Sequence, residues 1–257
     1  NEKNSSDQAA VQAMRLMLNT IEMNGTVIIG EGEKDDAPML FNGEIVGTGS
    51  APDIDIAVDP IDGTRLLALG RANALSTVAA SDSGSMFNPG PFVYMNKIAV
   101  GPEAKNSIDV EAPVEDNLSN VAKSKGCDVD DLTVVVLDRP RHASLIADLR
   151  KTGARIRLIT DGDVAGAVMT AWPGSGIDVL MGIGGTPEGV LAACALRCMG
   201  GEIQGKLWPR NDNEILRGDK MGYDFNSVLR MDDLVSSENC FFAATGITDG
   251  ELLSGVK

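Results

Sequence analysis

The stretch Asp-Ile-Ala-Val-Asp-Pro-Ile-Asp-Gly-Thr, residues 55–64, joins a predicted buried strand to an acidic turn. Residues 55–58 are predicted as a short buried strand, because Asp55 leads into the apolar and partly β-branched run Ile56-Ala57-Val58. Residues 59–64 are typical of a turn. Asp59 and Asp62 can converge at the end of the strand, where each raises the pKa of the other unless a cation lies between them. Oxygen ligands of this kind favour Mg²⁺ or Mn²⁺, whereas an Asx turn with solvated aspartates would need no ion.

A second acidic segment follows another predicted strand, residues 26–29. Acidic loops are usually solvated, but this loop lies between an apolar strand and the mainly apolar residues 37–40. We therefore expect part of it to lie near the interior. Its acidic residues are Glu31, Glu33, Asp35 and Asp36.

The pattern of predicted elements changes near the middle of the chain. The first half has strands with few helices, which predicts a mostly antiparallel sheet. The second half alternates strands with helices, which is typical of a parallel sheet. We therefore predict two domains, residues 1–128 and 129–257, with 209–232 as a polar surface excursion. Further elements expected in the first half are a helix at 8–19 and strands at 43–47, 72–81 and 92–100. In the second half we expect strands at 133–137, 155–160 and 177–181 and helices at 141–152, 163–171 and 186–199.

Three polar motifs, residues 138–141, 161–163 and 182–189, directly follow predicted strands of the second half. Ligands of open α/β sheets bind outside the carboxyl ends of strands, so we expect these motifs to line one edge. Arg139 and Arg141 suit phosphate oxygens, because planar guanidinium groups bind them bidentately. Surface ion pairs with nearby acids are the alternative for both arginines.

The glycine-rich motif at 182–189 has two interpretations. It partly matches a dinucleotide-binding loop, but Pro187 occupies the position of the last glycine. A phosphate or hydroxyl group on the amides of Gly184 and Gly185 fits better. Glu188 would lie in the first turn of the following helix, where a carboxylate favours the helix dipole without any further role.

Composition excludes several classes of protein. The formal net charge is −15, and such a surface repels nucleic acid. No apolar run is long enough to cross a bilayer, and no charged-then-apolar leader marks the chain for secretion. Four cysteines in 257 residues do not make a disulfide framework, so we expect reduced thiols, a cytoplasmic location and no membrane partner. Zinc at Cys194 and Cys198 is disfavoured because no histidine lies nearby, and the single histidine, His142, leaves little room for a Ser-His-Asp triad.

Four motifs together resemble the bacterial class II fructose-1,6-bisphosphatases of the lithium-sensitive phosphatase superfamily. They are residues 30–40, 59–64, 137–142 and 182–189, and the resemblance runs through nearly all of the chain. It implies an α/β (α+β) fold, a layered αβαβα sandwich of two sheet domains with the active site between them. It also implies hydrolysis of the 1-phosphate of fructose 1,6-bisphosphate in gluconeogenesis, dependence on Mg²⁺ or Mn²⁺, and a homodimer or homotetramer.

The resemblance assigns roles to individual residues. Asp35 and Thr64 would orient and deprotonate the attacking water. The implied metal ligands are Asp7, Glu31, Asp59, Asp62 and Glu188. The implied substrate contacts are Lys3, Asp62, Gly63, Thr64, Tyr94, Arg139, Pro140, Arg141, Asp161, Gly162, Asp163 and Gly185.

Several alternatives stay open. Asp7 could instead cap a helix. Many class II enzymes carry Glu where Asp62 stands, and residues 65–67 are bulkier than expected. The chain starts late and ends early against the family, so we expect it to be part of a longer protein. Sedoheptulose 1,7-bisphosphate, an inositol phosphate, or a silent sugar-phosphate-binding role are the alternative functions.

Overall fold

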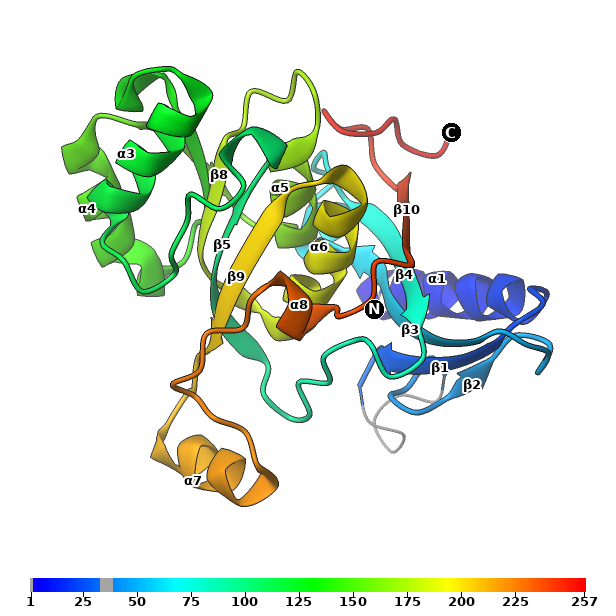
Figure 1. Ribbon diagram of the computed structural model, residues 1–257. Coiled ribbons are helices and arrows are strands. Elements are labelled where there is room, and N and C mark those ends of the chain that lie inside the picture. Colours follow the sequence, from blue (N-terminus) through cyan, green and yellow to red (C-terminus); the bar gives the residue numbers. More distant parts are fainter. Residues whose placement is uncertain (1, 33–38) are drawn as a thin grey trace.

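A computed structural model describes residues 2–32 and 39–257, and side chains from Asp7 onward. The strands form two five-stranded sheets, ordered β10-β4-β3-β1-β2 and β7-β6-β8-β5-β9 (Figure 1). The first sheet contains β1 (Asn24–Ile29), β2 (Ile45–Val46), β3 (Asp53–Asp62), β4 (Leu75–Asp82) and β10 (Cys240–Gly246). The second contains β5 (Tyr94–Val100), β6 (Thr133–Leu137), β7 (Arg155–Ile159), β8 (Val179–Gly185) and β9 (Glu202–Leu207).

The helices complete five layers. Two helices, α5 and α6, pack against each other and contact strands of both sheets, so they form the middle layer. Helix α1 covers the outer face of the first sheet, and α3 and α4 cover that of the second (Figure 1). The predicted αβαβα sandwich is therefore confirmed. The helices are α1 (Glu2–Leu18), α2 (Thr64–Ala68), α3 (Val114–Lys125), α4 (Ala143–Thr152), α5 (Asp163–Ala171), α6 (Thr186–Met199), α7 (Asp212–Met221) and α8 (Met231–Leu234), with 3₁₀ turns η1 (Pro102–Ala104), η2 (Val129–Asp131) and η3 (Pro140–His142).

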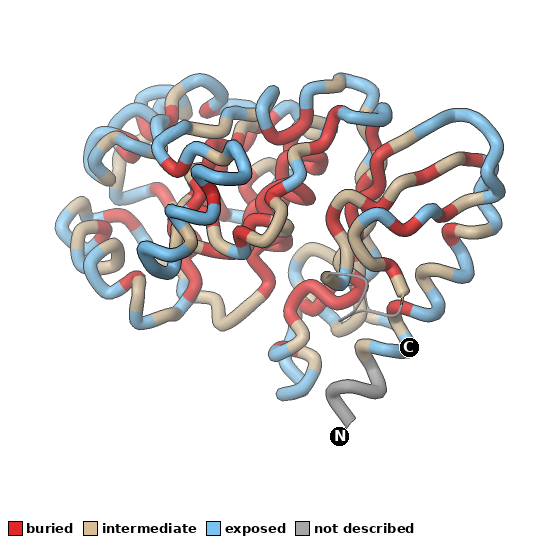
Figure 2. Tube along the Cα trace, turned by 90° about the horizontal axis from the view of Figure 1, so that it is seen from below, coloured by how far each residue is buried: buried red, intermediate tan, exposed pale blue. Residues whose placement is uncertain are grey.

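Strand β6 shows why its sequence is apolar throughout. Val134 and Val136 pack in the cluster formed with α3 and α4, whereas Val135 packs in the central cluster with α5 and α6. Strand β3 is similar, because Ile56 joins the cluster with α1 and Ala57 joins the central one. Figure 2 shows the buried residues gathered in the interior of the molecule and the exposed residues on its outer loops. Burial of both faces accounts for the continuous apolar runs.

Several local expectations were wrong. Strand β8 continues to Gly185, so the first three glycines of the motif at 182–189 lie in the strand, and the second sheet is mixed because β5 pairs antiparallel with β8 and β9. The turn expected at 59–64 is mostly strand, since β3 continues to Asp62 with a register shift against β4 between Asp59 and Asp62. Helix α1 begins at Glu2 rather than near residue 8, so Asp7 lies inside the helix and does not cap it. In the first sheet β1 and β3 pair in parallel, and the remaining pairs are antiparallel.

The two sheets exchange strands across the middle of the chain. Strand β5 precedes residue 129 but pairs with β8 and β9, while β10 near the C-terminus pairs with β4. The division into 1–128 and 129–257 stays a prediction. Helix α7 lies within the predicted excursion at 209–232 and projects from the body of the protein in Figure 1. No helix among the described residues is long and apolar enough to cross a membrane.

Candidate active site

Acidic side chains converge where β1 and β3 end and α6 begins. A cavity of about 200 Å³ lies there. Asp62 is buried at the end of β3 and accepts a hydrogen bond from the backbone N–H of Ala165 at 3.2 Å. Asp59 accepts one from the N–H of Ile61 at 3.0 Å. The cavity is lined by Gly30, Glu31, Val58, Asp59, Pro187, Glu188 and Leu191, so three of the predicted metal ligands meet at one place.

The acids raise one another's pKa values. Burial raises the pKa of Asp59 and Asp62 well above the ordinary range, and neighbouring carboxylates raise it further. Burial and then Asp163 raise the pKa of Glu188 to about 7. Enclosure of its carboxyl group and then the nearby Asp7 raise the pKa of Glu31, although the residue as a whole keeps an exposed surface. Each of these carboxyl groups therefore binds its proton more tightly than an ordinary surface acid does.

This donor set fits divalent cations. A cation between the carboxylates would offset their repulsion and stabilise their charged forms. Glu188 Oε2 is buried and has no hydrogen-bond partner among the described residues, which leaves it free to act as a ligand. Among the described residues, one trio of acidic side chains has possible ligand atoms that all lie within 4.8 Å of one another, and it lies outside this cavity. That trio, Asp128, Asp130 and Asp131, is exposed and precedes the start of β6, whereas the polar motif of this strand follows its end.

Lys97 brings a positive charge into the acidic cluster. It is 2% exposed, its Nζ lies 2.6 Å from Asp163 Oδ2, and Nζ donates a hydrogen bond of 3.0 Å to the carbonyl of Gly185. The sequence analysis assigned it no role. The available signal was its position on β5, in phase with Met95 and Ala99, which point into the central core.

Glycines let the carboxylates approach the backbone of β8. A Cβ on Gly184 would lie 2.0 Å from Asp163 Oδ2, and a Cβ on Gly185 would lie 1.6 Å from Glu188 Oε2. No larger residue fits at either position unless the acids move. The expected binding of a phosphate or hydroxyl group to these amides remains a prediction.

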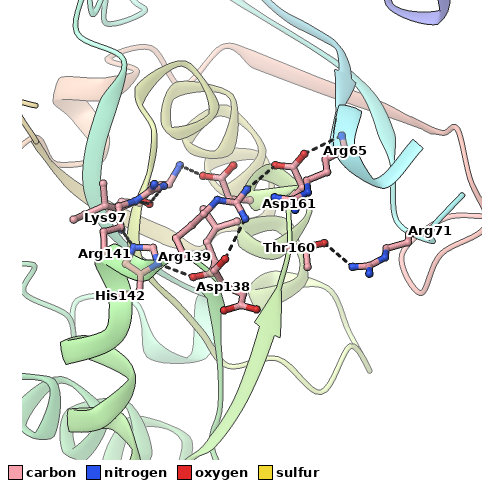
Figure 3. Close-up of polar contacts among 12 residues, drawn as sticks. Arg65, Arg71, Lys97, Asp138, Arg139, Arg141, His142, Thr160 and Asp161 are labelled. Atoms are coloured by element: carbon pink, nitrogen blue, oxygen red, sulfur yellow. Dashed lines mark hydrogen bonds and ion pairs between the residues drawn. The ribbon is translucent and has the colours of Figure 1, made fainter. Parts of the chain in front are cut away.

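Figure 3 shows the predicted cations, Arg139 and Arg141, near Lys97 and Asp161. Arg141 donates two hydrogen bonds to the carbonyl of Ile183, from Nε at 3.1 Å and Nη2 at 2.9 Å, and its Cζ lies 5.0 Å from the centroid of the Tyr94 ring. Arg139 Nη2 lies 3.6 Å from Asp161 Oδ1. Both arginines thus have partners in the protein, but Arg141 keeps further N–H donors for a ligand, since a guanidinium group carries five N–H bonds.

His142 connects the end of β6 to β8 by two hydrogen bonds, a role that the sequence analysis missed. The contacts define one neutral tautomer: Nδ1–H donates to the carbonyl of Leu137 at 2.6 Å, and Nε2 accepts from the N–H of Ile183 at 2.8 Å. Burial lowers the pKa of His142. A Cβ on Gly182, whose φ is +124°, would lie 2.9 Å from Nε2, so the ring needs glycine there.

The loop after β7 carries Asp161, which contacts both Arg139 and the start of α2. Asp161 Oδ2 accepts a hydrogen bond of 3.2 Å from the N–H of Arg65, next to Thr64 at the start of α2. Gly63 precedes Thr64 with φ +88°, and Gly162 precedes α5 with φ +83°. Asp35 and the side chain of Lys3 lie outside the described residues, so their predicted roles stay predictions.

Comparison with known proteins agrees with this arrangement. A family model described as bacterial fructose-1,6-bisphosphatase, glpX-encoded, matches residues 1–257. The chain is 47% identical over 269 aligned residues to fructose-1,6-bisphosphatase 1 class 2 of Escherichia coli strain K12, covering 100% of this chain and 80% of that protein. The class 2 fructose-1,6-bisphosphatases of E. coli O6:H1 and Shigella flexneri give the same identity and coverage.

Proposed function

Because the chain belongs to the glpX-encoded bacterial fructose-1,6-bisphosphatase family, we propose that it hydrolyses the 1-phosphate of fructose 1,6-bisphosphate. The products are fructose 6-phosphate and inorganic phosphate, as gluconeogenesis requires. The observation that supports this most directly is the buried Glu188 Oε2 without a hydrogen-bond partner among the described residues, at the edge of a cavity shared with Glu31 and Asp59.

Divalent cations, Mg²⁺ or Mn²⁺, would be held by the acidic cluster. When bound they supply Lewis-acid polarisation of the phosphoryl group and activation of water. Because the pKa values of Asp59 and Asp62 are raised and that of Glu188 is about 7, cation binding at these carboxyl groups would release protons. The ligands that we assign are Asp7, Glu31, Asp59, Asp62 and Glu188.

The remaining residues bind and orient the substrate. Arg139 and Arg141 bind the phosphate that is not cleaved, with Tyr94 packed beside Arg141. Residues 161–163 contact the sugar hydroxyl groups, and Lys97 keeps Asp163 and the Gly185 carbonyl in place. Further substrate contacts are assigned to Lys3, Asp62, Gly63, Thr64, Pro140 and Gly185.

Water attacks the phosphorus directly. Asp35 accepts the proton of that water, and the hydroxyl of Thr64 orients it, because a hydroxyl group can relay a proton but does not hold a net one. We assign both roles from the family resemblance. Losing a general base typically lowers kcat by ~10²- to 10⁴-fold.

Phosphate release from a panel of substrates tests the function. The panel contains fructose 1,6-bisphosphate, sedoheptulose 1,7-bisphosphate and inositol monophosphate, each with Mg²⁺, Mn²⁺ or excess EDTA. We expect the highest kcat/KM with fructose 1,6-bisphosphate and no turnover in EDTA. Asp59→Asn should lower kcat/KM by more than the ~10- to 100-fold loss typical of changing a residue that only contacts a metal ligand. Asp130→Asn in the exposed trio should retain full activity. Turnover in EDTA, or equal losses in both variants, would exclude the proposed site.

A homodimer or homotetramer in the cytoplasm is the expected setting of this activity. Sedimentation equilibrium of the purified chain distinguishes the two assemblies from a monomer.

A further inference from the structure

Three cysteine thiols meet at the end of α6 remote from the acidic cluster. Cys194 and Cys198 are four residues apart on α6, and Cys240 opens the edge strand β10. Cys198 Sγ lies 3.5 Å from Cys240 Sγ, and Cys240 Sγ lies 3.2 Å from the carbonyl oxygen of Cys194. Cys194 is buried, Cys240 is half-buried and Cys198 is exposed. The pair Cys198–Cys240 is therefore close together and open to solvent on one side.

The surroundings give the three thiols different reactivities. Hydrogen bonding from Cys194, and then from Cys198 and the charge of Arg197, lowers the pKa of Cys240 to about 6. Burial and the hydrogen bond with Cys240 raise the pKa of Cys198 to about 11. Arg197 is held in place by hydrogen bonds to Asp232 and to the carbonyl of Val235. The lowered pKa of Cys240 and its 3.5 Å separation from Cys198 Sγ favour Cys240 as the first thiol to react, with Cys198 as its protonated neighbour.

We propose that Cys240 and Cys198 form a thiol modification site, in which Cys240 reacts with a small disulfide and Cys198 then closes an intramolecular disulfide. In the first step the Cys240 thiolate attacks one sulfur of the small disulfide, whose S–S bond breaks and releases one small thiolate. In the second step Cys198 gives its proton to solvent and its sulfur attacks Cys240 Sγ, releasing the second small thiolate. The small disulfide is reduced by two electrons and the cysteine pair is oxidised by two.

The two sulfur atoms already lie close to bonding distance. The sulfur atoms must approach from 3.5 Å to about 2.05 Å. The new bond would tie α6 to the edge of the first sheet and close a loop containing residues 199–239. Cys198 is ten positions beyond Glu188 on one helix, about 15 Å along its axis, so this site is separate from the acidic cluster. It does not depend on the proposed function. Reducing conditions in the cytoplasm would make the bond transient, as expected of a reversible modification.

Thiolate chemistry alone predicts a modest advantage for Cys240. At pH 7 its thiolate fraction is about 30-fold that of an ordinary thiol. The lower nucleophilicity of an acidic thiol offsets about 13-fold of this, which leaves about a two- to threefold faster reaction. Cys127 is the matched control, because burial and nearby acids raise its pKa. The neighbouring Cys198 thiol therefore decides the final product, an intramolecular disulfide in place of a mixed disulfide, and the lowered pKa of Cys240 decides which thiol reacts first.

Glutathione disulfide is the probe. The reduced full-length chain is treated at pH 7, and intact mass and peptide mapping follow the products. We expect wild type to lose two hydrogens and to yield a Cys198–Cys240 peptide pair. Cys198→Ser should stop at one glutathione on Cys240, Cys240→Ser should leave Cys198 unmodified under the same conditions, and Cys127→Ser should behave as wild type.

Fold and activity controls keep the test decisive. Circular dichroism and phosphatase activity of reduced Cys198→Ser should match wild type, because Cys198 lies away from the acidic cluster. Cys198→Ala is the second variant if serine perturbs the helix end, and it should give the same mixed disulfide. Modification of Cys127 before Cys240, or a persistent mixed disulfide in wild type, would overturn the proposal.

Discussion

Replacing Lys97 with methionine should destabilise the protein far more than a change of shape would. Methionine keeps most of the buried volume but leaves Asp163 without the cation 2.6 Å from its Oδ2. Removing one partner of a buried ion pair costs about 3–5 kcal/mol. Loss of the hydrogen bond to the Gly185 carbonyl adds about 1 kcal/mol. We therefore expect the free energy of unfolding to fall by about 4–6 kcal/mol, against a typical total of about 5–15 kcal/mol.

Urea unfolding at pH 7.5 in excess EDTA measures this loss. The matched control is Lys151→Met, because Lys151 Nζ lies 2.7 Å from Asp148 Oδ1 but both side chains are exposed. That exposed pair should contribute no more than about 1 kcal/mol. The double variant Lys97→Met/Asp163→Asn should recover about 2–3 kcal/mol, because it removes the uncompensated charge together with its partner.

Metal adds a second measurement. A divalent cation at 100 times its Kd stabilises the folded state by about 2.7 kcal/mol. We expect it to stabilise Lys97→Met at least as much as wild type, because the variant has one positive charge fewer among the acids. A loss below about 1.5 kcal/mol for Lys97→Met, together with additive single and double variants, would refute this account of the ion pair.

Three further predictions concern His142, Arg141 and Thr64. Burial lowers the pKa of His142, so the unfolded chain binds more protons below pH ~6.5 and stability is lost as pH falls through that range. The free energy of unfolding measured in urea should therefore decline less between pH 7.5 and 5.5 for His142→Gln than for wild type, by up to ~1.4 kcal/mol per pH unit. Arg141→Ala should raise KM for fructose 1,6-bisphosphate by the equivalent of about 1.5–3 kcal/mol and leave a substrate without a second phosphate unaffected; unchanged bisphosphate kinetics would make Arg141 structural. Thr64→Ala should lower kcat by a larger factor than the loss of substrate binding that calorimetry measures, and kcat restored at high Mn²⁺ would instead indicate a metal defect.

Local pattern was sufficient for much of the second half of the chain. The helices Asp163–Ala171 and Thr186–Met199 and the strand Thr133–Leu137 have the predicted bounds. Their ends are set by nearby residues, such as the left-handed Gly162 before α5 and Pro187 in the first turn of α6. A strand that is buried on both faces also has a continuous apolar run, which predicts the strand without knowledge of its neighbours.

Other features were outside the reach of pattern. The edge strand β10 has no clean alternation of buried and exposed residues, and its pairing with β4 joins positions far apart in the chain, such as Phe242 and Ala79. The transfer of β5 into the second sheet is set by hydrogen bonds to β8 and β9. A helix needs only its own backbone partners, whereas a strand takes its partners from the folded chain.

The sequence by itself determined the acidic motifs, the cationic motif and the strand ends that carry them. Only the tertiary structure decided that Lys97 lies buried beside Asp163 and that His142 joins Leu137 to Ile183. The physical reason is that a charge or a ring nitrogen buried away from water must find its partner through space. That partner can stand anywhere in the sequence, so no spacing along the chain reveals it.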